Sequence, residues 1–287
     1  MTNEVSYNRA MKPTSSTPRA RALAAGLREL REAHGMGLRK LARILGFAPQ
    51  ALSLWEKGLR LPTVADVALI LGFFKVNGEK QKHLLELART ARERDWVTPG
   101  SPEITPELSG LLECERSATK ITAWAFTIIP GILQTPDYAR AILSNSDLTP
   151  IQADTHLTTR LDRQRILSRP EPVRYQAIIN ERALHEPVAS EDIMSDQMDH
   201  LLEVAKRPNV SLRVLTAEGS YHPGMLGSFF LYEYGDTPPI ALLEHAYSSA
   251  FLYEEDHIRA YFGLAKVLSG RALSEDASRD LIAEAAR

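Results

Sequence analysis

The chain has 287 residues, of which 44% are hydrophobic and 24% charged, values typical of globular proteins and sufficient for about two domains. No stretch approaches the ~18 consecutive apolar residues that a membrane helix needs, and residues 1–18 lack the apolar core of a signal peptide. The single cysteine, Cys114, excludes an intrachain disulfide, so the composition predicts a cytoplasmic protein with no membrane partner.

The charge is unevenly distributed along the chain. Residues 1–95 carry 17 Lys and Arg against 9 Asp and Glu, a net charge of +8, and the remaining residues therefore carry −10 within the total of −2. The first third thus favours a polyanionic partner, which the rest of the chain would repel. Basic helical surfaces are also common in proteins that bind no nucleic acid, so this observation needs a second one beside it.

The first third is predicted to be helical after a short arm. Residues 1–18, rich in Ser, Thr and Pro, predict a disordered arm. In residues 19–95, apolar spacings of three and four predict five short helices in a compact all-α domain. The inward positions are Leu23, Leu27 and Leu30; Leu38, Leu41 and Leu45; Leu52 and Trp55; Val67, Ala68 and Leu71; and Leu84, Leu87 and Ala88. Gly46 ends the second helix, Pro49 starts the third, Thr63 caps the fourth, and the fifth runs from about Glu79 to Asp95.

A second domain is predicted beyond a linker at residues 96–102, where two prolines and a glycine interrupt helical structure. Helical patterns at about 103–118, 136–145, 151–169, 190–206, 256–270 and 275–286 alternate with strand-like runs at about 121–129, 173–180, 209–216, 226–234 and 239–253. The expected fold is therefore an all-α domain followed by an α+β, or α/β, domain at residues 103–287.

Four residues within the basic domain have the spacing of a helix-turn-helix. Ala42 supplies the small residue where two helices cross, and Gly46 accepts a left-handed backbone in the turn. Leu52 and Trp55 supply the inner side of the second helix. With that side buried, Pro49, Gln50, Ser53, Leu54 and Lys57 are expected to point outward.

The stretch from Gly35 to Gly58, GMGLRKLARILGFAPQALSLWEKG, resembles the Cro/repressor, or xenobiotic-response-element, helix-turn-helix family. The rest of the chain is similar to the C-terminal domain of actinobacterial antitoxin-like transcriptional regulators. The matching pieces are Pro130-Gly131-x-Leu133-Gln134-Thr135-x-x-Tyr138-Ala139, Arg160-x-x-Arg163-Gln164, Glu181-x-Ala183-Leu184 and Pro208-Asn209-Val210.

The resemblance implies that the third helix enters the major groove of double-stranded DNA. Gln50, Ser53 and Leu54 would read bases, since glutamine pairs with adenine and leucine packs on a thymine methyl. Phosphate contacts would come from Arg39, Arg43, Lys57 and Arg60. Leu54 replaces an arginine that is frequent in the family, and Gly37 and Leu38 replace a polar pair, so Arg39 or Arg43 would take over the backbone contact.

The second domain offers weaker candidates. Arg160, Arg163 and Gln164 indicate either a charged helix face or a site for an anion or an acidic partner, and the charged face is the commoner structure. Glu244-His245 and His185-Glu186 lack zinc-ligand spacing, and Cys114 on an apolar helix face is more typical of a packed thiol than of a nucleophile. The sequence also lacks a nucleotide-phosphate loop, so no metal, cofactor or catalytic residue is expected.

These observations predict a non-enzymatic, sequence-specific transcription regulator that binds DNA as a homodimer. The second domain would dimerise, sense a ligand or bind a protein. The resemblance implies a small protein encoded by a neighbouring gene. Two alternatives stay open: an antitoxin-like protein that chiefly sequesters such a partner, and a regulator that responds to a small ligand.

Overall fold

The computed structural model describes residues 17–91, 98–99, 106–144, 148–217, 219–235, 237–245 and 248–287. The chain divides into two compact units, Met1–Arg94 and Asp95–Arg287. Most of the predicted arm and of the predicted linker lies outside the described residues. Within the linker range, Thr98–Pro99 forms a short strand, β1, that belongs to the sheet of the second unit. No helix in the described part of the chain is both long and apolar enough to span a membrane.

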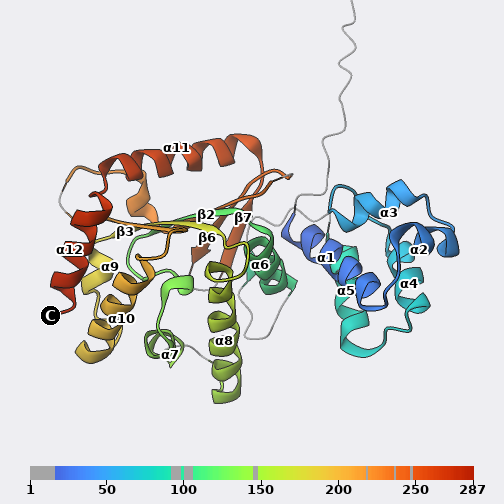
Figure 1. Ribbon diagram of the computed structural model, residues 1–287, viewed down its shortest axis with the longest axis horizontal. Helices are drawn as coiled ribbons and strands as arrows, with labels where there is room; N and C mark the ends of the chain where they lie inside the picture. The colour runs from blue at the N-terminus through green and yellow to red at the C-terminus, as the bar shows by residue number, and fades with distance from the viewer. Residues whose placement is uncertain are drawn as a thin grey trace, which may run out of the picture. The chain divides into compact units, whose positions relative to one another are not determined.

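The first unit is built from five helices around one apolar core (Figure 1). Their bounds are α1 Pro18–Ala33, α2 Leu38–Leu45, α3 Pro49–Glu56, α4 Val64–Phe73 and α5 Gly78–Thr90. The five predicted helices are confirmed, and Gly46, Pro49 and Thr63 lie at the helix ends expected of them. The fifth helix, predicted to run from about Glu79 to Asp95, ends at Thr90, and residues 92–95 lie outside the described residues. The last two residues of the predicted arm, Thr17 and Pro18, belong to the start of α1. Thr17 caps α1, its hydroxyl accepting from the Ala20 amide and donating to the Ala91 carbonyl, and Pro18 is the first helical residue.

The residues that the fourth helix buries differ slightly from the predicted ones. Thr63 caps it as expected, in a reciprocal capping box with Asp66. Val67, Ile70 and Leu71 are buried, whereas Ala68, predicted to face inward, is exposed. The helix is apolar almost all round, so apolar spacing alone does not select its buried side.

The second unit combines helices with a seven-stranded sheet, which confirms an α+β fold. Its helices are α6 Pro106–Ser117, α7 Pro136–Ser144, α8 Pro150–Arg163, α9 Arg182–His185, α10 Glu191–Val204, α11 Glu255–Arg271 and α12 Glu275–Ala285. Its longer strands are β2 Lys120–Ala125, β3 Arg174–Asn180, β4 Val210–Leu215, β5 Phe229–Glu233, β6 Ile240–His245 and β7 Ser248–Leu252. Short 3₁₀ helices occupy Gly131–Leu133, Gln164–Leu167 and Pro223–Leu226.

The sheet is mixed, with strand order β1-β7-β6-β5-β2-β3-β4. β2, β3 and β4 are parallel because helices cross over between them, whereas β5, β6 and β7 pair antiparallel. β2 joins the two halves, and its Ile121 lies between Tyr175 of β3 and Tyr232 of β5. The α/β features that the sequence left open are therefore confined to one half of the sheet.

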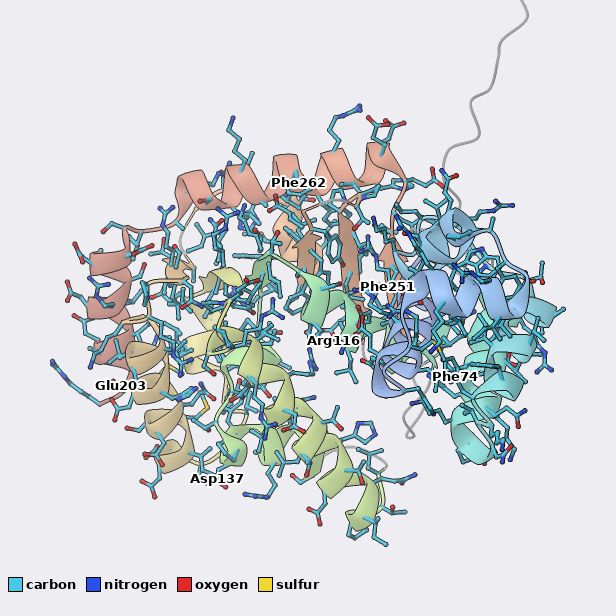
Figure 2. The ribbon with its side chains drawn as sticks, turned by 45° about the vertical axis from the view of Figure 1, so that its right-hand side comes forward. Phe74, Arg116, Asp137, Glu203, Phe251 and Phe262 are labelled. Carbon is cyan, nitrogen blue, oxygen red and sulfur yellow. The ribbon has the colours of Figure 1, made fainter. Side chains whose placement is uncertain are left out.

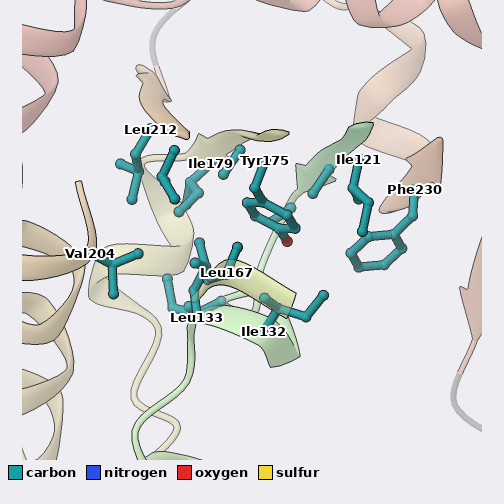
Figure 3. Close-up of a cluster of buried hydrophobic side chains, with 14 of the residues drawn as sticks. Ile121, Ile132, Leu133, Leu167, Tyr175, Ile179, Val204, Leu212 and Phe230 are labelled. Atoms are coloured by element: carbon teal, nitrogen blue, oxygen red, sulfur yellow. The ribbon is translucent and has the colours of Figure 1, made fainter. Parts of the chain in front are cut away.

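Helices cover both faces of the sheet (Figure 1). α11 covers one face, where Ala265 and Leu268 pack with Trp124 of β2, and Phe262 packs against the same cluster (Figure 2). The larger core lies on the other face, under α6, α7, α8 and α10, with α12 beside α10 and β4. Figure 3 shows part of this larger core, with Ile132 and Leu133 facing the sheet residues Ile121 and Ile179.

Three predicted elements of the second unit differ in extent. The run at 239–253, predicted as one strand, is the antiparallel pair β6 and β7. The reversal was not predicted because no Gly, Pro or Asn marks it in the sequence. The helix predicted at 151–169 is α8 followed by a 3₁₀ helix. The strand predicted at 121–129 ends at Ala125, before an exposed Ile128.

Candidate functional site

The turn between α2 and α3 has the geometry that the sequence predicted. Ala42 is fully buried where the two helices meet. Gly46 ends α2 with a φ of 74°, in the left-handed region. The Gly46 and Phe47 amides both donate to the Ala42 carbonyl, the latter over 2.8 Å, which satisfies the end of the helix within the turn.

The inner side of α3 anchors it to the core. Pro49 occupies the first helical position, and Leu52 and Trp55 are buried, as expected. The Trp55 ring meets Phe47 of the turn edge to face, with ring centroids 5.0 Å apart. The orientation of α3 is therefore set by apolar contacts on both sides of the turn.

The outer side of α3 carries the predicted base-reading residues. Gln50 and Lys57 are exposed, seven residues apart and so on the same side of the helix. Ser53 and Leu54 lie between them on that side but are only half-exposed. Gln50 is thus the most accessible of the three predicted base readers.

Four cations frame this surface. Arg39 and Arg43 are exposed one turn apart on α2, and Lys57 and Arg60 are exposed at and beyond the end of α3. None of the four forms an ion pair with a carboxylate within the described part of the chain. Their charges are consequently available to an external anion.

A buried ion pair that the sequence analysis missed ties α3 to α1. Glu56, at the end of α3, is 4% exposed, and its carboxylate accepts from Arg31 Nε and one terminal nitrogen, each over 2.7 Å. Arg28 donates to the Glu56 carbonyl over 2.7 Å. The hydrogen bonds that Arg31 donates to Glu56 raise the Arg31 pKa, against a smaller opposing effect of burial. The signal in the sequence was a carboxylate at the end of an otherwise uncharged helix.

In the second unit, the structure brings Arg160, Arg163 and Gln164 together beneath the sheet. Arg163 donates to both oxygens of Glu115 on α6, each over 2.7 Å, and the Glu115 side chain is 2% exposed. Arg160 donates to the Gln134 side-chain oxygen over 2.9 Å, and Gln164 donates to the Gln134 carbonyl over 2.6 Å. A solvated charged face is therefore the wrong interpretation for these three residues, although Arg165, in the 3₁₀ helix that follows α8, is exposed.

Polar groups of the sheet face this cluster. Tyr175 of β3 is 1% exposed, and its hydroxyl has no hydrogen-bond partner among the residues that the structure describes, which costs about 1–3 kcal/mol. Burial raises the pKa of the Tyr175 phenol, with Glu115 and Arg163 as nearby charges. Glu244 of β6 interacts electrostatically with Arg163, Glu115 and Arg160. Its side chain reaches solvent, yet surrounding protein removes enough hydration to raise the pKa of its carboxyl group.

Sequence reasoning missed Glu115, Gln134 and Tyr175 as members of this cluster, because each comes from a different element. It had considered Glu244 only as a neighbour of His245. Within the described residues, no three His, Cys, Asp or Glu side chains are grouped to hold a metal ion. Cys114 is fully buried on α6.

Two protein families match the chain. Residues 27–80 match the family described as Helix-turn-helix, and residues 108–284 match the family described as Domain of unknown function (DUF5753). No curated protein and no solved structure matches the chain.

Proposed function

The chain belongs to the DUF5753 family and carries a Cro/C1-type helix-turn-helix before that domain, and from this premise we propose that it is a sequence-specific transcription regulator. The observation that carries the proposal is the outer side of α3, where exposed Gln50 and Lys57 lie beside the exposed Arg39 and Arg43 of α2. A helix placed in the major groove needs such a side, with polar groups for bases and cations for phosphates.

The residues divide between two tasks. Gln50, Ser53 and Leu54 read bases, with Gln50 making the main polar contact because it is the most exposed of the three. Arg39, Arg43, Lys57 and Arg60 contact phosphates, which attract cations whatever the sequence. The ion pair between Arg31 and Glu56 holds the end of α3 in position for both tasks.

The regulator acts as a homodimer, since one helix of eight residues contacts too few base pairs to select an operator alone. Two symmetric copies read two half-sites and double the contacts. Light scattering on the full chain tests this point directly, with twice the chain mass of 32.0 kDa as the expected result and the mass of one chain as the contrary one.

The second domain acts in regulation rather than in DNA binding or catalysis. Residues 96–287 carry a net charge of −10, which disfavours contact with DNA. The polar cluster of Arg160, Arg163 and Glu244 supports a sensing role, and a small protein partner is the alternative occupant of this domain. Turnover of any substrate by the purified chain would overturn the non-enzymatic assignment.

The test of DNA reading begins with selection of bound duplexes from randomised DNA by the full chain. Gln50→Ala is expected to weaken binding to the selected duplex by about 1–3 kcal/mol and to leave binding to random DNA nearly unchanged. Arg43→Ala is expected to weaken both equally and to reduce the slope of log affinity against log salt by about 0.9.

Arg89→Ala is the matched control, because Arg89 is an exposed arginine of the same unit on α5. It is expected to change neither affinity nor salt slope. If selection enriches no sequence, or if Gln50→Ala weakens both duplexes alike, the base-reading proposal is wrong.

A further inference from the structure

Five elements of the second unit contribute polar side chains to one cluster under the sheet. They are Glu115 of α6, Gln134 after the first 3₁₀ helix, Arg160 and Arg163 of α8, Tyr175 of β3 and Glu244 of β6. A core that served packing alone would place apolar groups here, as the same face does at Ile121, Ala177 and Leu212.

The charges of the cluster are only half satisfied. Arg163 and Glu115 compensate each other through two short hydrogen bonds. Among the described residues, the Arg160 side chain has only the neutral Gln134 oxygen as a hydrogen-bond partner, and Glu244 has no hydrogen bond or ion pair. Burial, and then Arg163, lower the pKa of the Arg160 guanidinium, while Glu244 raises it. Arg160 and Glu244 thus attract each other without coming within the ~4 Å of an ion pair.

A third group in the cluster lacks a partner. The Tyr175 hydroxyl is buried and has no hydrogen-bond partner in the described part of the chain, and it interacts electrostatically with Glu115, Arg163 and Glu244. In Figure 3 the Tyr175 ring descends from the sheet beside Ile121 toward Ile132. An unpaired buried hydroxyl beside two charges that are not in contact is the arrangement of a site prepared for a ligand.

We propose that this cluster binds a small zwitterionic ligand of the amino-acid class, with the ligand carboxylate at Arg160 and its ammonium group at Glu244. The Tyr175 hydroxyl donates one further hydrogen bond to the ligand. Two arginines and two glutamates leave the cluster with no net charge, so a ligand of net charge would bring an uncompensated charge into a desolvated place. A zwitterion supplies each free group with an opposite charge.

Water is the competing partner for these groups. A water molecule offers hydrogen bonds but no counter-charge, so it leaves the Arg160 guanidinium without an anion. An anion alone would pair with Arg160 but would repel Glu244. The experiment therefore compares ligands that carry both charges with ligands that carry one.

The ligand class proposed here rests on the regulatory role proposed for the second domain, but binding is measured without DNA, so failure of either proposal is seen separately. The full chain is melted with each common protein amino acid singly at about 5 mM, and with acetate and methylamine at the same concentration. At least one amino acid is expected to raise the melting temperature by about 5 °C, as a ligand at about 100 times its Kd does. Calorimetry then gives its Kd, with acetate and methylamine expected to bind at least about tenfold more weakly.

Three variants locate the site. Arg160→Gln and Glu244→Gln are each expected to abolish binding, and Tyr175→Phe to weaken it about tenfold. Arg165→Gln is the control, because Arg165 lies on the same segment with its side chain 81% exposed, and it is expected to leave the Kd unchanged. Glu244 is exposed, so its variant tests the site even if Arg160→Gln fails to fold.

Absence of any amino-acid effect overturns the proposal, and so does an unchanged Kd in Glu244→Gln. Acetate binding as tightly as the best amino acid shows an anion site and overturns the zwitterion assignment. Equal loss in Arg165→Gln places the ligand elsewhere.

Discussion

Removal of the Glu56 carboxylate is expected to destabilise the DNA-binding unit more than removal of any surface carboxylate. Glu56 and Arg31 form a two-point ion pair between α3 and α1, with side chains 5% and 12% exposed. In Glu56→Ala the Arg31 guanidinium keeps the Met36 carbonyl and the exposed Glu32 as partners, but loses the only buried carboxylate that the structure gives it.

The magnitude follows from the burial of the pair. Breaking a buried pair by removing one partner costs about 3–5 kcal/mol, and the residual exposure of Arg31 places this pair near the lower end, at about 3 kcal/mol. That value corresponds to about a 150-fold change in the equilibrium between folded and unfolded unit. Glu56→Gln keeps the shape and one hydrogen bond, so it is expected to cost less.

Amide hydrogen exchange on the full chain measures this effect, because peptides from α1 and α3 report on the first unit alone. Protection in these peptides is expected to fall about 150-fold in Glu56→Ala. Glu79→Ala is the control, since Glu79 pairs with Lys82 on the surface of α5 with both side chains largely exposed. It is expected to leave protection unchanged, because surface pairs contribute little.

A double variant tests the reasoning itself. Replacing both partners, in Arg31→Met/Glu56→Leu, removes the unpaired charge and is expected to recover most of the loss. A change below about threefold in Glu56→Ala would refute the account, since it would put the pair at well under 1 kcal/mol. So would a double variant no more stable than Glu56→Ala.

Three further outcomes are expected. Gly46→Ala should destabilise the first unit by about 1–2 kcal/mol, because its φ of 74° strains any side chain although nothing lies within 4 Å of the added carbon. Gly72→Ala, equally open but within α4, should not lower the melting temperature, and equal losses would contradict the strain argument. The Cys114 thiol should react with a thiol reagent only as the second unit unfolds, and rapid reaction in native buffer would contradict its burial. Burial raises the pKa of Tyr138 to about 12, so its phenol ionises at lower pH in the unfolded chain than in the folded one. The free energy of unfolding should therefore fall by up to about 1.4 kcal/mol per pH unit between about pH 10 and 12. Tyr138→Phe should decline less over this range, and parallel curves would contradict the shift.

The first unit could be read almost completely from the sequence because its signals are local. Gly46, Pro49 and Thr63 each set a helix end through their own backbone preferences or side-chain caps, within a few residues of the element they bound. Spacing then predicted that Leu52 and Trp55 are buried and Gln50 exposed. Where spacing was uninformative, in the apolar α4, the prediction for Ala68 was wrong.

The fold of the second unit could be predicted less completely from the sequence. The existence and order of its longer helices and strands followed from composition, but the short helix α9 was not predicted. The break between β6 and β7 was not predicted either, since the residues there carry no turn preference. That β2, β3 and β4 run parallel depends on which strands become neighbours, which no single segment encodes.

The sequence by itself determined the helix-turn-helix, the charge difference between the two parts of the chain and the α+β character of the second. Only the tertiary structure decided that Glu56 is buried against Arg31, 25 residues away, and that Arg163 meets Glu115, 48 residues away. It also placed Arg160, Tyr175 and Glu244 in one cluster. The physical reason is that a charged side chain has the same local preferences whether solvated or buried, and its partner is fixed only when distant elements pack together.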